Sequence, residues 1–212
     1  MKKLVLGLAV TLAAFAGSAH AVYLDFVAEA AGNERGVADG TTINFSGLDV
    51  TFTSLSAGTF FAYFDDLDDG KPAGLGVCEI LSAGPGSACA DSSDDNIRSG
   101  DAVTLTFADP VTVSNFSFTD ADHNDLNTND IDTLLIAIND ANDFMQYTFA
   151  EAVALVISGV DLIRFAFDDN GNGRQFYVNG FEAAAVPLPA AAPLLLAGLA
   201  GLGFASKRKK KN

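Results

Sequence analysis

The sequence contains a series of short runs in which apolar and polar residues alternate, and this pattern limits the possible folds more than any other. Alternation with a period of two puts successive side chains on opposite faces of a β-strand. The runs are separated by clusters of Gly, Asn, Asp and Pro, which favour turns. We therefore predict an all-β domain of antiparallel strands. The runs are 42–45, 48–54, 59–64, 102–107, 111–118, 133–139, 144–149, 162–167 and 174–183.

The number and length of these runs predict an antiparallel β-sandwich, jelly-roll-like in type. No stretch shows a sustained apolar face of helical period with helix caps. Residues 22–185, about 165 in number, are enough for one domain with a proper core. Phenylalanines in the alternating runs are expected to fill the space between the sheets. They are Phe52, Phe107, Phe118, Phe149, Phe165 and Phe167.

The N-terminal segment has the three parts of a secretory signal peptide. Lys2 and Lys3 precede an apolar stretch over 4–17, and Ala19-His20-Ala21 is a small-x-small cleavage site. We predict a signal peptide over 1–21, removed by signal peptidase. The alternative is an N-terminal membrane anchor, for which the apolar stretch is short.

The C-terminal segment combines a short apolar run with a basic end. The 16 residues of 190–205 carry no charge. As a helix they would extend about 24 Å, short of the roughly 30 Å of a hydrocarbon core. We predict a short C-terminal transmembrane helix whose basic end is cytoplasmic under the positive-inside rule. The basic residues are Lys207, Arg208, Lys209, Lys210 and Lys211.

The box Val186-Pro187-Leu188-Pro189-Ala190, followed by this helix and basic end, resembles the PEP-CTERM sorting signal in its VPLPA form. The resemblance implies an exported protein, held briefly at the inner membrane and cut near the box by an exosortase-type enzyme. Leu188 stands where the commonest form has Glu, and lysines stand where arginines are usual. An ordinary single-span anchor is the alternative reading of 186–212.

The domain between these segments resembles, more loosely, the exported domains of the same family. The resemblance runs over 74–184 and includes "GLGV", "DSSDDNI", "GDAVTLTF" and "VTVSNFSF". It implies a β-sandwich and no established activity.

The charge of the domain excludes one class of partner. Residues 22–185 hold all 27 acidic residues and five basic ones, a net charge of −22. Such a surface repels nucleic acid and anionic membranes, so we expect no nucleic-acid partner. It is compatible with divalent cations, which would screen the repulsion.

Two cysteines, Cys78 and Cys89, flank a segment rich in Gly, Pro and Ser. An even count in an exported chain favours a disulfide. Closing a loop of this size would stabilise the fold by up to about 3 kcal/mol. A metal-binding pair or two free thiols are the alternatives.

Two acidic turns are the main candidates for calcium. Asp168, Asn170 and Asn172 alternate before Gly173, as in the opening of a calcium-binding loop, where oxygen ligands recur at every second residue. An EF-hand is excluded because Asn179 occupies the twelfth position, where a glutamate is required. Hairpin turns use the same residue types, so solvated turns are the alternative.

The second acidic turn has Asp120, Asp122 and Asn124 at the same spacing but lacks the glycine. The stretches 65–70 and 91–95 are weaker candidates still. These patterns make Ca²⁺ the one candidate cofactor, and we expect no other.

No catalytic constellation stands out, and we expect no enzymatic activity. His123 is the single histidine after signal cleavage, and the chain has no G-x-S-x-G turn to pair with it. Zinc would need more His or Cys. The first hypothesis is therefore an exported, non-catalytic surface or extracellular-matrix protein. The alternative is a calcium-dependent module that binds extracellular polysaccharide, although the chain has no Trp and only four Tyr.

Overall fold

The computed structural model describes residues 20–54, 60–66, 70–91, 95–126 and 131–186, which form a single unit. The paired strands are all antiparallel, so the all-β prediction is confirmed. The strands are β1 (Ala21–Asp25), β2 (Arg35–Val37), β3 (Thr41–Phe45), β4 (Leu48–Ser54), β5 (Phe61–Asp65), β6 (Gly74–Cys78), β7 (Ala102–Asp120), β8 (Thr133–Ile138), β9 (Phe144–Thr148), β10 (Val156–Phe167) and β11 (Phe176–Ala185).

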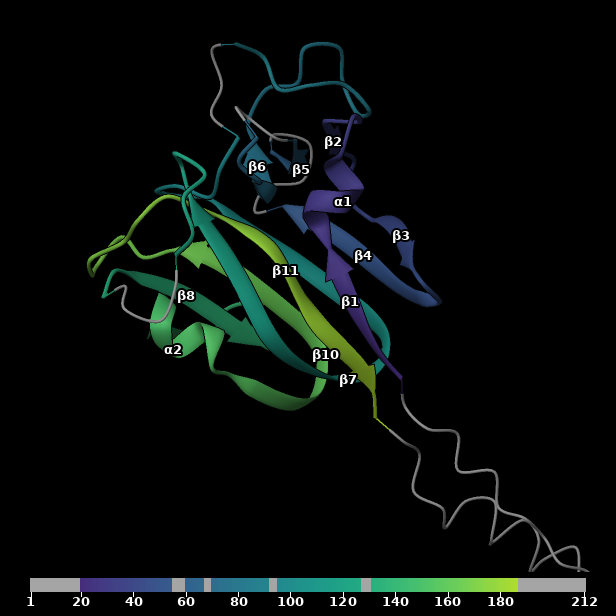
Figure 1. The fold of residues 1–212 in the computed structure, drawn as a ribbon, viewed down its shortest axis with the longest axis vertical. Helices are drawn as coiled ribbons and strands as arrows, with labels where there is room; N and C mark the ends of the chain where they lie inside the picture. The colour runs from purple at the N-terminus through teal and green to yellow at the C-terminus, as the bar shows by residue number, and fades with distance from the viewer. Residues whose placement is uncertain (1–19, 55–59, 67–69, 92–94, 127–130, 187–212) are drawn as a thin grey trace, which may run out of the picture. The chain divides into compact units, whose positions relative to one another are not determined.

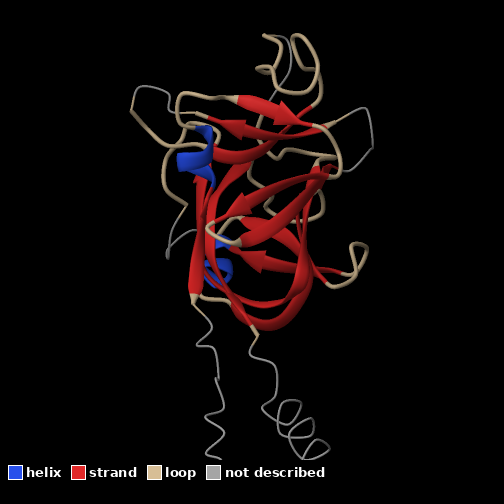
Figure 2. Cartoon of the chain, turned by 90° about the vertical axis from the view of Figure 1, so that its right-hand side faces the viewer, coloured by secondary structure: helices blue, strands red, loops and turns tan. Residues whose placement is uncertain are grey.

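These strands form one continuous hydrogen-bonded sheet rather than two separate ones. Its main order is β2-β5-β6-β11-β7-β10-β8-β9, with β1 joined to β11 and β4 joining β3 to β7. This single sheet folds over into two layers, and strands β7 and β10 are long enough to take part in both. Figure 2 shows the layers facing each other, with long strands bending from one to the other.

Strand β7 merges two runs that the alternation pattern separates. Its first half pairs with β4 from Val103 to Phe107, and its second half pairs with β11 from Val111 to Asp120. Pro110 lies between the halves. The partner strand β10 has register shifts between Ser158 and Leu162, opposite the same region. Bulges of this kind increase the local twist and bend of a strand, so one strand serves both layers.

The core is built largely of phenylalanine, as predicted. Phe52, Phe107, Phe118 and Phe165 are buried on the strands, and Phe118 packs edge-on against Phe165. Phe149 is also buried, whereas Phe167, at the end of β10, is only partly buried against the core. Each buried aromatic ring contributes roughly 2–3 kcal/mol of transfer free energy.

Two single-turn helices interrupt the strands, which the alternation pattern did not predict. In α1 (Phe26–Ala30) the Asp25 side chain accepts from the Ala28 amide at 2.9 Å. In α2 (Phe149–Val153) Thr148 and Glu151 form a capping box. The first residue of each helix, Phe26 or Phe149, is fully buried, so each turn anchors the chain to the core. Within the described part of the chain, no helix is long and apolar enough to cross a bilayer.

The predicted disulfide is confirmed. Cys78, the last residue of β6, is bonded to Cys89, with Cα atoms 5.9 Å apart. The bond closes a loop that packs Leu81 against Tyr63. It therefore stabilises an irregular segment that contributes few residues to the main core.

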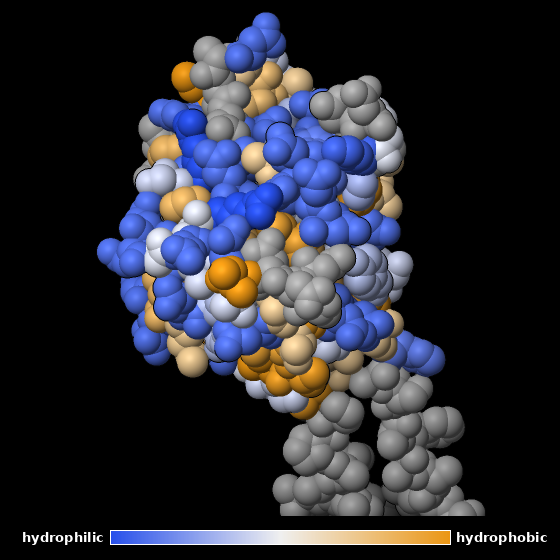
Figure 3. Space-filling model, turned by 60° about the vertical axis from the view of Figure 1, so that its left-hand side comes forward, coloured by the Kyte–Doolittle hydropathy of each residue, from blue (hydrophilic) through white to orange (hydrophobic). Residues whose placement is uncertain are grey.

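The first and last strands end side by side. Ala21 of β1 pairs with Ala184 of β11, so residues 20 and 186 leave the domain at the same end. Strands β5 and β6 lie at the opposite end (Figure 1). Apolar side chains are exposed near the chain ends, among them Val156 and Val186, and the face drawn in Figure 3 is otherwise largely hydrophilic.

Candidate functional site

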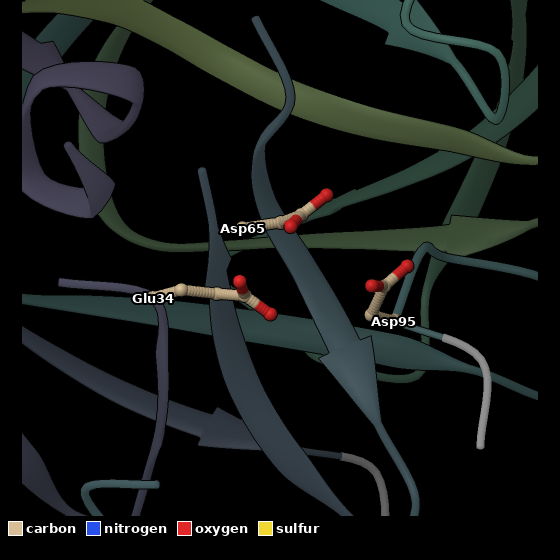
Figure 4. Close-up of side chains that lie close together, drawn as sticks. All are labelled: Glu34, Asp65 and Asp95. Carbon is tan, nitrogen blue, oxygen red and sulfur yellow. The ribbon is translucent and has the colours of Figure 1, made fainter. Parts of the chain in front are cut away.

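Three carboxylates converge at the end of the domain that holds β5 and β6. Glu34, Asp65 and Asp95 each place an oxygen within 4.8 Å of the other two. Figure 4 shows the three side chains approaching one another from separate segments of the chain. We call this group the acidic cluster.

Backbone pairing brings the three segments together. Asp65 ends β5, and the pairing of Arg35 with Phe64 puts the preceding Glu34 beside it. The Val77 amide of β6 donates to the Asp95 carbonyl at 3.0 Å. This approach requires glycine at position 76, because a Cβ there would lie 2.0 Å from the Asp95 carbonyl oxygen. Backbone pairing therefore places the three residues of the cluster close together, independently of contacts between their side chains.

Two buried tyrosines donate to the cluster. The Tyr63 hydroxyl donates to Glu34 Oε1 and accepts from the Cys89 amide at 2.9 Å. The Tyr177 hydroxyl donates to Asp95 Oδ1. Burial, followed by nearby carboxylates, raises the pKa of both phenols, so both stay protonated as donors. Tyr63 thereby links the cluster to the disulfide loop.

Asp65 is buried within the cluster, and its carboxyl has a raised pKa. The residue is 8% exposed. Burial, and then the charges of Asp95 and Glu34, raise the pKa of its carboxyl to about 7. His123 Nε2 lies 3.4 Å from Asp65 Oδ2, and its ring packs edge-on against Tyr177. Ordinary neutral pH is therefore the range in which this carboxyl changes charge.

The arrangement can reduce its charge repulsion in two ways. A proton can reside on Asp65, or a cation can lie among the three oxygens. Glu34, Asp65 and Asp95 supply only oxygen ligands, which suit Ca²⁺ or Mg²⁺ rather than a softer metal. Among the described residues, these three form a group of acidic side chains close enough together to hold a divalent ion.

The predicted calcium turn at 168–173 is built around one buried aspartate. Asp168 Oδ1 accepts from the amides of Asn170 and Gly171, both at 3.0 Å, and Oδ2 accepts from Thr133 and Gln146. Burial alone would raise the pKa of Asp168, but these hydrogen bonds outweigh it and lower the pKa. The carboxylate organises the turn, and Asn170 and Asn172 lie exposed beside it.

The predicted turn at 120–124 has two basic neighbours. Arg174 Nη2 lies 2.6 Å from Asp120 Oδ2. Lys71 Nζ donates to Asn124 Oδ1 at 3.0 Å and to the Asp122 carbonyl at 3.3 Å. Burial would raise the pKa of Asp120, but hydrogen bonds from Asn124 and the charge of Arg174 lower it. The ammonium group of Lys71 thus supplies positive charge next to the ligand atoms predicted for calcium.

Sequence reasoning ranked the parts of the acidic cluster low or missed them. Asp65 and Asp95 belong to the two stretches considered weaker, and Glu34 was not singled out. No local pattern marks Glu34, since its role depends on pairing with a segment 31 residues away. The calcium prediction for the two turns stays a prediction. Residues 187–212, with most of the VPLPA box and all of the basic end, lie outside the described residues.

Comparisons with known proteins give no assignment. No family model, no curated protein and no solved structure matches this chain.

Proposed function

We propose that this chain is an exported, non-catalytic domain of the cell surface or extracellular matrix. In this proposal residues 1–21 direct export, and residues 186–212 tether the chain until an exosortase-type enzyme cuts near the VPLPA box. The observation that carries the proposal is the Cys78–Cys89 disulfide. Disulfides of this kind form and persist in oxidising compartments, outside the cytoplasm.

The placement of the chain ends also supports it. Residues 20 and 186 leave the domain at one end, so both proposed targeting segments can reach the same membrane without crossing the domain. The acidic cluster and the disulfide loop lie at the other end (Figure 1).

Intact mass of the protein from its native host, fractionated into medium, envelope and cytoplasm, tests the proposal. We expect a mass that begins at Val22, lacks the residues beyond the box and is lower by two hydrogens for the disulfide. The double variant Pro187→Ala with Pro189→Ala should keep its tail and remain in the membrane fraction. The matched control, Pro193→Ala, alters a proline outside the box. A wild-type chain that keeps its full tail in the membrane would make the segment an ordinary anchor.

The second candidate is the calcium-dependent carbohydrate-binding module. The observation in its favour is a cavity beside the 168–173 turn, to which Phe167 and Asp169 contribute. Retention on polysaccharide is measured with calcium and with EDTA, for the wild type and for Asn170→Ala with Asn172→Ala. The side-chain amides of these two residues are exposed, and they can be removed without loss of the hydrogen bonds that Asp168 accepts. Equal retention in calcium and EDTA would contradict the calcium dependence and leave the glycan binding in place.

A further inference from the structure

Two neighbouring cavities, which share lining residues, lie where β7 begins and β10 ends. One has a volume of about 300 Å³, the other about 280 Å³, and both are lined by Gly100 and Asp101. The larger is also lined by Arg164, Asn142, Phe144 and Asp169. We call the larger cavity the Arg164 pocket. A volume near 300 Å³ is at the small end of ligand sites, the size of a single small unit rather than a cofactor.

Arg164 differs from the other arginines of the domain. Arg35, Arg98 and Arg174 each form an ion pair with a carboxylate. In the described part of the chain Arg164 forms none; its Nη1 donates to the Ala141 carbonyl at 3.1 Å, and its guanidinium lies over the Phe144 ring at 5.6 Å.

The Arg164 Nε atom is buried and lacks a hydrogen-bond partner among the described residues. A buried donor without a partner costs about 1–3 kcal/mol, so it calls for an explanation. Because Nε is buried, a ligand oxygen in the pocket would satisfy it only if the Arg164 side chain, which lines the pocket, turned toward the cavity. Burial also lowers the pKa of Arg164, as expected for a desolvated cation.

The remaining lining residues decide the chemical class of that ligand. Asp101 and Asp169 are hydrogen-bond acceptors held in place by Arg98 and Ser99. Together with the net charge of −22 they disfavour an anion, while Arg164 disfavours a cation. Phe144 and Leu135 supply an apolar wall. Donors, acceptors and an apolar face around one small cavity fit a neutral, hydroxylated ring.

We propose that the Arg164 pocket binds a neutral sugar unit of a polysaccharide. Arg164 donates to a ring or hydroxyl oxygen, Asp169 and Asn142 bond to hydroxyl groups, and Phe144 packs against the sugar face. The neighbouring cavity, with Phe60 and Glu79, holds the next unit of the chain. This inference rests only on the glycan-binding part of the alternative above, and it replaces the calcium dependence of that alternative with binding that needs no calcium.

Affinity electrophoresis tests it on the oxidised protein recovered from its host. The gels contain dextran, mannan, galactan or soluble β-glucan, with alginate as the anionic comparison and with calcium or EDTA. We expect at least one neutral polysaccharide to retard the wild type equally in both buffers, and alginate to leave its mobility unchanged.

Two variants assign the binding to the pocket. Arg164→Met and Asp169→Asn should each weaken affinity about tenfold or more, the effect of losing a hydrogen bond to a charged group. The matched control is Arg35→Met, which removes another arginine that lies over a phenylalanine ring, 5.2 Å from Phe64. Since Asp169 is exposed, Asp169→Asn keeps the test valid if Arg164→Met fails to fold.

Absence of retardation by every neutral polysaccharide would overturn the proposal, as would retardation that both variants leave intact. Stronger retardation by alginate would contradict the neutral class, and loss of retardation in EDTA would contradict calcium independence. None of these results depends on tail processing, which intact mass reports separately. A failure of the sugar site is therefore distinguishable from a failure of the export proposal.

Discussion

The acidic cluster should make the stability of this domain fall as the pH rises from 5 to 8. Asp65 has its pKa raised from 3.8 to about 7 in the folded state. Between these values the folded protein holds a proton that the unfolded chain has released. The unfolded state therefore binds fewer protons, and the free energy of unfolding falls as the pH increases through this window. Above about pH 7 the Asp65 carboxyl is ionised in the folded state as well, and the full loss of stability is present.

The magnitude follows from the size of the shift. Each pH unit over which the two states differ by one proton changes the free energy of unfolding by about 1.4 kcal/mol. Between pH 5 and pH 8 this difference holds up to about pH 7, so the full effect would be about 2.6 kcal/mol. Solvent reaches part of the carboxyl, whose side chain is 11% exposed. Screening reduces the expected change to about 2 kcal/mol. The lowered pKa values of Asp120 and Asp168 affect stability in more acidic solution, outside this window.

Urea unfolding of the oxidised protein at pH 5, 6.5 and 8, at fixed ionic strength with EDTA, measures the effect. The stability advantage of Asp65→Asn over the wild type should be about 2 kcal/mol larger at pH 8 than at pH 5, because the variant lacks the carboxyl whose ionisation destabilises the wild type over this range. The control Asp161→Asn removes an exposed charge and should keep the wild-type slope. His123→Gln is measured in parallel, because the imidazole contacts Asp65.

Two results would refute this reasoning. One is a wild-type domain that is as stable at pH 8 as at pH 5. The other is an Asp65→Asn variant with the wild-type pH dependence, since the linkage would then belong to other groups. A slope that vanishes in His123→Gln and persists in Asp65→Asn would assign it to the imidazole instead.

Three further predictions concern stability, each measured by urea unfolding. Replacing Cys78 and Cys89 by serine should lower the free energy of unfolding by about 3 kcal/mol, and an unchanged midpoint would contradict this. Gly76→Ala should cost several times more than Gly159→Ala, because a Cβ at 76 meets the Asp95 backbone, whereas at 159 it meets open space and costs about 1 kcal/mol in backbone strain. Phe118→Ala, in the centre of the core, should cost about 3–5 kcal/mol, and a loss below 1 kcal/mol would disprove tight packing there.

Local alternation was sufficient to predict most strands, because burial on one face imposes a period of two wherever the other face meets solvent. It failed for β6, in which every residue from Gly74 to Cys78 is buried, so no alternation is visible. It also separated the two halves of β7, since Pro110 resembles a turn when the partner strands are unknown. The signal for α2 was present in Thr148 and Glu151, a capping box too short to produce a helical period.

The strand-rich class, the phenylalanine core, the acidic charge and the pairing of the two cysteines could be inferred from the sequence alone. These follow from side-chain chemistry and from neighbours close along the chain. Three features became visible only in the folded chain: β7 and β10 join the two layers, Glu34, Asp65 and Asp95 meet, and Arg164 lines a cavity. Each of these depends on register between segments that are far apart in sequence, and one residue of slip would turn every side chain of a strand to its other face.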